Sequence, residues 1–142
     1  MNMRIWLEDY KLEDLKRVSE INMLAHLGIE YTELGPDYLK GRMPVDARTR
    51  QPFGVLHGGA SVVLAESLGS SAANLVVDQR ESYCVGLDIN ANHLRPVSEG
   101  WVTGIARPLH IGKTTQVWEI KIENEAGKLV CVSRLTMAVV KR

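Results

Sequence analysis

Residues 54–77 form a long stretch that carries a single formal charge, the carboxylate of Glu66. Read as a helix, this stretch is apolar around most of its circumference, so other elements of the fold must cover it. The residues three and four positions away from Glu66 are small or apolar: Val62, Val63, Gly69 and Ser70. A carboxylate buried on such a face without a partner costs several kcal/mol, which makes Glu66 the first candidate for chemistry.

The segments on either side of this helix predict an antiparallel sheet. Residues 12–26 predict one or two short helices with a break near Asn22, and residues 29–43 predict a hairpin that turns at residues 35–37. Four later segments alternate with the period of a strand, the second of them with a strand end or bulge at Pro108: residues 83–92, 101–109, 116–123 and 129–139. Their connections are too short for parallel crossovers. The sequence therefore predicts a single α+β domain, 1–142, in which an antiparallel sheet curls around one long central helix, the hotdog fold.

The composition excludes several classes of function. The 17 basic and 17 acidic residues balance without a basic cluster among aromatic residues, so we expect no nucleic-acid partner. Residues 1–10 lack the apolar core of a signal peptide, and the helical stretch is too rich in Gly and Ser to span a membrane, so we expect a soluble protein. Cys84 and Cys131 lie in alternating apolar segments as expected of buried free thiols, which favours the cytoplasm. The His and Cys spacings predict no metal, and we expect no other cofactor.

Residues near Glu66 are candidates for the same chemistry. Ser70 lies one turn later on the same face, where it can hold a water molecule or the carboxylate. Gly58 opens the helical run, where unpaired backbone N–H groups at the positive end of the helix dipole would stabilise an oxyanion. Gln51 offers an amide donor to the same oxygen, and His57 is a weaker candidate for a general base.

Each of these residues also has a structural interpretation. Glu66 at a helix crossing or a dimer seam would be paired with an Arg from elsewhere. A Gly pair would make a tight loop-to-helix entry, a helical Ser more often bonds to the backbone, and His57 would cap the helix. Taken one by one, the residues leave both interpretations open.

Helix geometry constrains the assembly. Gly58 and Glu66 are eight residues apart, which at about 1.5 Å per residue separates them by roughly 12 Å along the helix axis. One carbonyl group cannot touch both, because reacting atoms lie about 3 to 3.5 Å from their catalytic groups. If both act on one substrate, one of them must come from a second copy of the chain. We therefore predict active sites shared across a two-fold dimer interface.

Another candidate segment, residues 110–115, lies between two predicted strands. It contains Gly-Lys-Thr, but Arg107 stands where a P-loop needs Gly, so nucleotide-triphosphate chemistry is set aside. The turn can still hold a phosphate, with Arg95 and Arg107 as a basic rim for a phosphorylated carrier. An ordinary hairpin turn with scattered surface arginines is the alternative.

Motifs along nearly the whole chain are similar to those of a known family. They lie at residues 44–46, 51–54, 56–61, 65–67, 86–87 and 90–93. In these motifs the chain resembles the hotdog-fold acyl-CoA thioesterases of the phenylacetate and 4-hydroxybenzoyl-CoA type. Residues 25–29 and 95–100 resemble a branch that acts in enterobactin synthesis, and residues 62–64 and 89–92 resemble a branch that acts in menaquinone biosynthesis.

Carried over residue by residue, the resemblance implies a role for each candidate. Glu66 is the catalytic carboxylate, as nucleophile or as general base on water. Gly58 supplies the oxyanion N–H, Gln51 orients or polarises the thioester carbonyl, and Ser70 assists hydrolysis. In this family the carboxylate faces the donors of a partner subunit, and the dimers usually pair into homotetramers. The residues implied to bind CoA are Gly86, His93, Leu94, Arg95, Pro96, His110, Ile111, Gly112, Lys113, Thr114 and Thr115.

The resemblance further implies the reaction, which is hydrolysis of an aromatic acyl-CoA to the free acid and CoA without a metal. The acyl group is expected to be of the dihydroxynaphthoyl or hydroxybenzoyl type. Ser71 is smaller and more polar than the Val or Met expected in the two branches, so the acyl group itself stays open. One alternative is a hydroxyacyl-thioester dehydratase, for which His57 is the candidate near the helix start. The other is a non-catalytic acyl-CoA-binding module.

Overall fold

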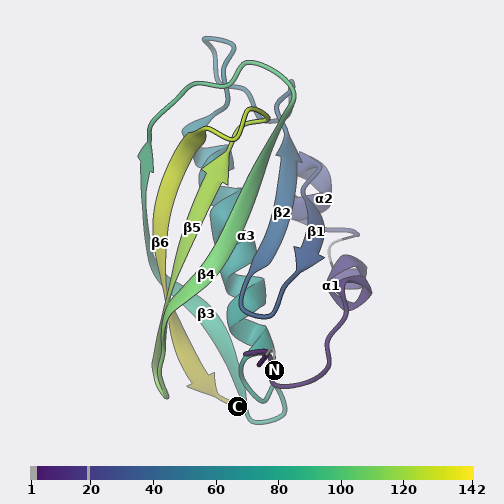
Figure 1. Ribbon diagram of the computed structural model, residues 1–142, viewed down its shortest axis with the longest axis vertical. Helices are drawn as coiled ribbons and strands as arrows, with labels where there is room; N and C mark the ends of the chain where they lie inside the picture. Colours follow the sequence, from purple (N-terminus) through teal and green to yellow (C-terminus); the bar gives the residue numbers. More distant parts are fainter. Residues whose placement is uncertain (1–2, 19) are drawn as a thin grey trace.

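The computed structural model of the protein describes residues 3–18 and 20–142 (Figure 1). Its helices and strands follow the predicted order of short helices, hairpin, long helix and four strands. They are α1 (Leu12–Val18), α2 (Met23–Leu27), β1 (Glu30–Leu34), β2 (Leu39–Pro44), α3 (Gly58–Leu75), β3 (Ser82–His93), β4 (Trp101–Ile111), β5 (Thr115–Glu123) and β6 (Leu129–Lys141). The break near Asn22 is confirmed, because its side chain caps α2 by accepting a hydrogen bond from the N–H of Leu24 at 3.1 Å.

The described strands form one antiparallel sheet in the order β1-β2-β4-β5-β6-β3. The sheet curls around α3, which lies along its concave face (Figure 1). The register between β4 and β5 shifts between Pro108 and His110, so the proline marks a bulge and β4 continues through it. This architecture confirms the predicted α+β hotdog fold.

Helix α3 packs closely on the sheet because glycines face its largest side chains. Leu68 is completely buried. A β-carbon built on Gly41 would lie 2.8 Å from Leu68 Cδ2, and one built on Gly104 would lie 2.7 Å from Leu68 Cδ1. Only glycine lets the backbone of β2 and β4 approach this side chain so closely. The contact fixes the rotation of α3 about its axis and leaves Glu66 directed toward β3. Neither α3 nor another described helix is long and apolar enough to cross a membrane.

Strand β3 lies at one edge of the sheet, beside β6. Its register with β6 shifts between Gly86 and Asp88, which makes Leu87 the extra residue of a bulge. Val85 is 42% exposed and Leu87 is 62% exposed, although a regular period of two would place them on the same face as the half-buried Ile89. As an edge strand, β3 also presents unpaired backbone groups to its surroundings. The edge of the sheet is therefore both apolar and open to pairing.

The N-terminal segment packs against the far end of α3. Trp6 is buried, its ring stacks on Trp118 with centroids 6.4 Å apart, and its Nε1 donates a hydrogen bond to the carbonyl of Gly35 at 2.7 Å. The N–H of Leu7 donates to the carbonyl of Leu75, the last residue of α3, at 2.9 Å. These contacts hold the chain before α1 over the C-terminal end of α3.

Candidate active site

Glu66 lies in the middle of α3 and faces a cavity of about 410 Å³. The cavity is lined by Met23, Leu24, Tyr31, Val63, Glu66, Ser67, Ser70 and Ser71. The Glu66 side chain is half-buried and forms neither a hydrogen bond nor an ion pair with any residue that the structure describes. The Arg that the structural interpretation requires is therefore not supplied by the described part of this chain. A carboxylate held in a cavity without a partner is available for chemistry.

Gly86 of β3 leaves room for the Glu66 carboxylate. A β-carbon built on Gly86 would lie 2.6 Å from Glu66 Oε2, which is closer than such atoms approach in real proteins. Any side chain at position 86 would therefore displace the carboxylate. The family resemblance implies that Gly86 binds CoA, and that contact stays a prediction. The structure adds that this residue adjoins the catalytic candidate itself.

We expect Gly86→Ala to lower kcat by about ten- to a hundredfold, because a misplacement of about 1 Å can cost about 10²-fold in rate. The midpoint of thermal unfolding should not fall, since glycine weakens a strand relative to alanine. Thiol release and a thermal melt would measure the two effects. In a Glu66→Gln background, Gly86→Ala should change kcat little, because both substitutions act through the same carboxylate. A further loss in that background would show that Gly86 acts in another way.

The start of α3 borders a separate cavity of about 360 Å³ around Gly58. His57 precedes the helix, and its Nδ1 accepts a hydrogen bond from the N–H of Gly59 at 2.8 Å. His57 therefore caps the helix, and a role for it as a general base stays a prediction. The N–H of Gly58 has no partner among the described residues and lies at the positive end of the helix dipole. It is the backbone group at this end that is available to an oxyanion.

Gln51 and the residues that follow β3 line the same cavity. The Oε1 of Gln51 accepts a hydrogen bond from the N–H of Phe53, which leaves the amide NH₂ group to donate. His93 touches the helix start, since a β-carbon built on Gly58 would lie 2.8 Å from its Nε2. The structure thus brings the predicted oxyanion donors next to one predicted CoA segment. The full lining is Gln51, Val55, Leu56, Gly58, His93, Leu94, Arg95, Pro96 and Val130.

The two cavities are separate within one chain. We call the residues Glu66, Ser67 and Ser70 the carboxylate half-site, and Gln51, Gly58 and His93 the donor half-site. None of the described residues lines both cavities, and the helix rise separates Glu66 from Gly58 by roughly 12 Å. The Ser70 hydroxyl approaches Met137 Sδ at 3.8 Å. Within one chain, the Glu66 carboxylate and the N–H of Gly58 therefore do not face a common cavity.

The other predicted CoA segment, residues 110–115, lies at the opposite end of the sheet from the donor half-site (Figure 1). Along β6, Thr115 pairs with Ala138 whereas His93 pairs with Cys131. These two β6 positions are seven residues apart, which spans roughly 23 Å at about 3.3 Å per residue. The two predicted CoA segments are therefore not adjacent within one chain.

Sequence reasoning missed the residues that reach the carboxylate half-site from other elements. The hydroxyls of Tyr31 and Ser71 lie 2.5 Å apart, although the two residues are 40 positions apart in the chain. Met23 and Leu24 of α2 line the same cavity. Burial raises the pKa of the Tyr31 hydroxyl, which therefore stays protonated at neutral pH. No local motif marks these residues, because only the packing of α2 and β1 on α3 brings them to Glu66.

Comparisons with known proteins give one family. Residues 53–131 match the thioesterase superfamily. A 1,4-dihydroxy-2-naphthoyl-CoA hydrolase of Escherichia coli is 53% identical over 135 residues, which are 95% of this chain and 98% of that protein. A proofreading thioesterase of Cronobacter turicensis is 52% identical over 136 residues, again 95% and 98% of the two chains. The structure of a mutant thioesterase from Pseudomonas aeruginosa matches with a TM-score of 0.95 and 50% identity over 97% of this chain and 99% of that chain. The protein therefore belongs to the thioesterase superfamily, and it is a thioester hydrolase of the hotdog fold.

Proposed function

We propose that the protein hydrolyses an aromatic acyl-CoA to the free acid and CoA, with Glu66 as the catalytic carboxylate. As a general base, Glu66 takes a proton from water while the water oxygen bonds to the thioester carbonyl carbon. As a nucleophile, its own oxygen bonds to that carbon, and water then cleaves the anhydride. In both routes the carbon–sulfur bond breaks, and the CoA thiolate leaves and takes up a proton. The N–H of Gly58 and the amide of Gln51 stabilise the oxyanion.

The proposal rests above all on one observation, the unpaired Glu66 carboxylate in its cavity of about 410 Å³. A structural carboxylate at such a place would be held by a cation, because leaving the charge unpaired is strongly unfavourable. Ser70 lines the same cavity one turn later, where it is available to hold the attacking water. These features support a carboxylate kept free for substrate.

Strand β3 supports the dimer that this mechanism needs. A long edge strand with exposed apolar side chains is a template for pairing with another strand. Val85 and Leu87 give β3 such side chains. Antiparallel pairing of β3 with its copy around a two-fold axis would continue the sheet from one subunit into the next and cover both residues.

The register of this pairing follows from the contacts of α3. Glu66 lies level with Gly86 of β3, and Gly58 lies level with His93. Glu66 would therefore meet the partner's Gly58 if position 86 of one strand pairs near position 93 of the other. The midpoint of these positions puts the two-fold axis near residues 89–90. Each of the two sites would then combine the carboxylate half-site of one subunit with the donor half-site of its partner.

The same pairing supports the prediction that both segments bind CoA. In an antiparallel pair the strand ends exchange, so residues 110–115 of one subunit would lie at the same end of the dimer as His93 of the partner subunit. Lys113 in that turn would offer a positive charge to a CoA phosphate. The pairing of dimers into a homotetramer is implied by the family resemblance alone and stays a prediction.

An aromatic acyl group is supported by the carboxylate cavity and by the relatives. Met23, Leu24 and Val63 give the cavity apolar walls, and Tyr31 adds an aromatic ring with a hydroxyl. The name of the Escherichia coli relative specifies a dihydroxynaphthoyl substrate, and the Cronobacter turicensis relative is named for proofreading. We propose an acyl group of the dihydroxynaphthoyl or hydroxybenzoyl type. A place in menaquinone biosynthesis stays a prediction.

A dehydratase is not favoured by the contacts of His57. That reaction needs a histidine near the helix start with a ring nitrogen directed at the acyl chain. The Nδ1 of His57 instead accepts the N–H of Gly59, and its side chain is exposed. Hydration of an enoyl-CoA without any release of thiol would nevertheless reverse this assignment.

A panel of acyl-CoA substrates tests the proposed function. We expect kcat/KM for dihydroxynaphthoyl-, dihydroxybenzoyl- or benzoyl-CoA to exceed that for straight-chain acyl-CoA by about tenfold or more, a difference that pocket contacts can supply. Equal values would contradict the aromatic assignment. The protein's own thiols will not disturb a thiol-release assay, because Cys84 and Cys131 are buried and burial raises the pKa of Cys84 to about 11. A cytoplasmic location, which these free thiols favour, stays a prediction.

A further inference from the structure

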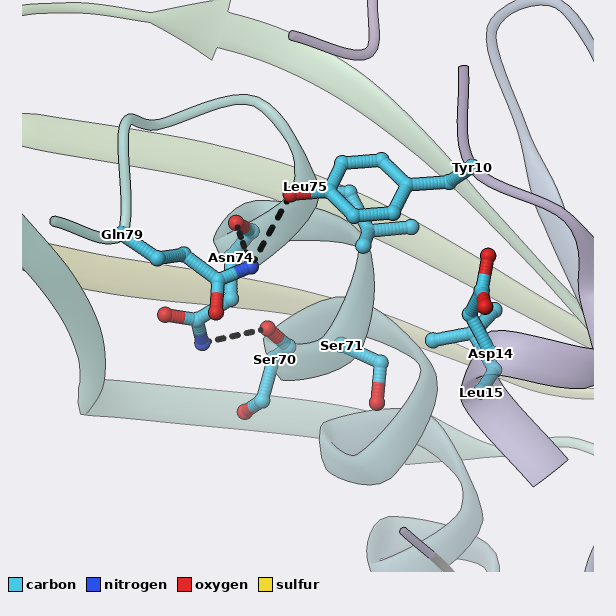
Figure 2. Close-up of a pocket in the computed structure, with 8 residues that line it drawn as sticks. All are labelled: Tyr10, Asp14, Leu15, Ser70, Ser71, Asn74, Leu75 and Gln79. Atoms are coloured by element: carbon cyan, nitrogen blue, oxygen red, sulfur yellow. Dashed lines mark hydrogen bonds between the residues drawn. The ribbon is translucent and has the colours of Figure 1, made fainter. Parts of the chain in front are cut away.

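Another cavity, which we call the distal chamber, adjoins the cavity around Glu66. It has a volume of about 360 Å³ and shares Ser70 and Ser71 with that cavity. Figure 2 shows Ser70, Ser71 and Asn74 of α3 on one side of it. Tyr10, Asp14 and Leu15 of the N-terminal segment face them from the other side. The two cavities therefore follow one another along α3, away from the catalytic candidate.

We propose that the distal chamber is a second acyl subsite, which accepts the far end of an acyl group longer than one aromatic ring and recognises a neutral hydroxyl on it. This inference rests on the proposed function, because it takes the thioester carbonyl to lie at Glu66. From Glu66 to Asn74, α3 rises by roughly 12 Å. A single ring bound beside Glu66 would lie within the first cavity, and only a longer acyl group would extend toward Tyr10.

The polar groups of the distal chamber are suited to a hydroxyl. The Tyr10 hydroxyl accepts a hydrogen bond from Gln79 Nε2 at 3.5 Å, and it donates its own proton to no residue in the described part of the chain (Figure 2). Burial, together with the nearby charge of Glu8, raises the pKa of Tyr10, so the hydroxyl keeps that proton. Asp14 contributes a carboxylate as an acceptor. A substrate hydroxyl beside Tyr10 can accept a hydrogen bond from the Tyr10 hydroxyl.

The charges along both cavities favour a neutral acyl group. Asp14 lines the distal chamber and Glu66 lines the first cavity, while no Lys, Arg or His lines either of them among the described residues. An acyl group with a second carboxylate would meet only like charge there. The distal chamber therefore discriminates against dicarboxylic acyl groups.

The wall that carries Tyr10 is held in place by its own hydrogen bonds. Asp14 Oδ2 accepts the N–H of Lys11 at 2.8 Å at the start of α1. The Gln79 side chain, which reaches Tyr10, also donates to the carbonyl of Asn74 at 2.8 Å. The amide that bonds to the Tyr10 hydroxyl is thus itself anchored at the end of α3.

Tyr10→Phe tests the subsite, because it removes the hydroxyl and keeps the ring. The substrates are benzoyl-CoA, 2-naphthoyl-CoA and 6-hydroxy-2-naphthoyl-CoA. We expect kcat/KM for the hydroxynaphthoyl substrate to fall by about two- to tenfold, which is the effect of one lost hydrogen bond, and the other two values to stay unchanged. Tyr38→Phe is the matched control, because its hydroxyl bonds to Glu33 and it lines neither cavity. It should leave all three values unchanged.

Binding to the Glu66→Gln variant separates this proposal from the proposed function, because dissociation constants for intact substrates report recognition without hydrolysis. Weaker binding of the hydroxynaphthoyl substrate alone, when Tyr10→Phe is added, would support the subsite even if the wild type released no thiol. In that case only the proposed function would fail. Hydrolysis by the wild type with equal losses for all three substrates in Tyr10→Phe would overturn the subsite and leave the proposed function intact.

Discussion

Replacing Glu66 with Gln is expected to lower kcat for aromatic acyl-CoA hydrolysis by about 10²- to 10⁴-fold, because an amide of the same shape neither takes a proton nor attacks a carbonyl. The substitution should not lower the stability of the fold. Glu66 has no hydrogen-bond or ion-pair partner among the described residues, so the substitution breaks no contact and removes a half-buried charge. We therefore expect the thermal unfolding midpoint to equal or exceed that of the wild type. Thiol release at saturating substrate and a thermal melt measure the two quantities.

Glu119→Gln is a matched control for this experiment. Glu119 lies on β5, where its carboxylate is 3.7 Å from the ammonium group of Lys121. Exposed ion pairs contribute little to stability. Glu119 lines neither the cavity around Glu66 nor the cavity around Gly58. The control should hydrolyse substrate at the wild-type rate. If Glu66→Gln did so as well, the catalytic group would have to be another residue, with His57 as the next candidate.

The two half-sites were predictable because their signals are local. Glu66 carries the single formal charge in a helix of 18 residues. Such a charge among apolar residues can be recognised from the sequence of the helix alone. Gly58 follows the capping residue His57, so the sequence alone places an N–H at a helix start. The position of Gly86 opposite Glu66 was not predictable in this way, since it depends on how α3 rests on the sheet.

The walls of the cavities were not predictable, because they depend on tertiary packing. Tyr31 reaches Ser71 across 40 positions of sequence, and Tyr10 reaches Gln79 across 69 positions. The pattern of residues within one helix or strand cannot predict contacts between residues so far apart in the sequence. The bulge at Leu87 is a similar case, since it arises from the pairing of β3 with β6 and a single strand pattern does not show it.

Gly58→Pro is expected to lower kcat by about 10²- to 10³-fold, the usual effect of removing one oxyanion donor. Gly58 is the first residue of α3, a position at which proline is favoured in helices because the N–H there has no partner within the helix. The preceding residue, His57, has φ −69° and ψ 130°, a conformation that proline accepts in its neighbour. The helix should therefore form normally, and the thermal unfolding midpoint should change little.

Gly58→Ala is the control for the added side chain. Both variants place a β-carbon about where it would meet His93 Nε2, at 2.8 Å, and the exposed imidazole must move in both. Only the proline variant also removes the N–H. We expect Gly58→Ala to retain most of the activity, so the difference between the two variants isolates the donor. Equal losses in both would show that contact with His93, and not the N–H, explains the effect.

Mixed dimers then decide whether the half-sites meet across an interface. A dimer of one Glu66→Gln subunit and one Gly58→Pro subunit can be purified through two different affinity tags. If each site combines Glu66 of one subunit with Gly58 of the partner subunit, one site of this dimer carries both substitutions and the other carries neither. The mixed dimer should then show about half of the wild-type rate, although both parent dimers are nearly inactive. If each subunit worked alone, every site would carry one substitution and no activity would return.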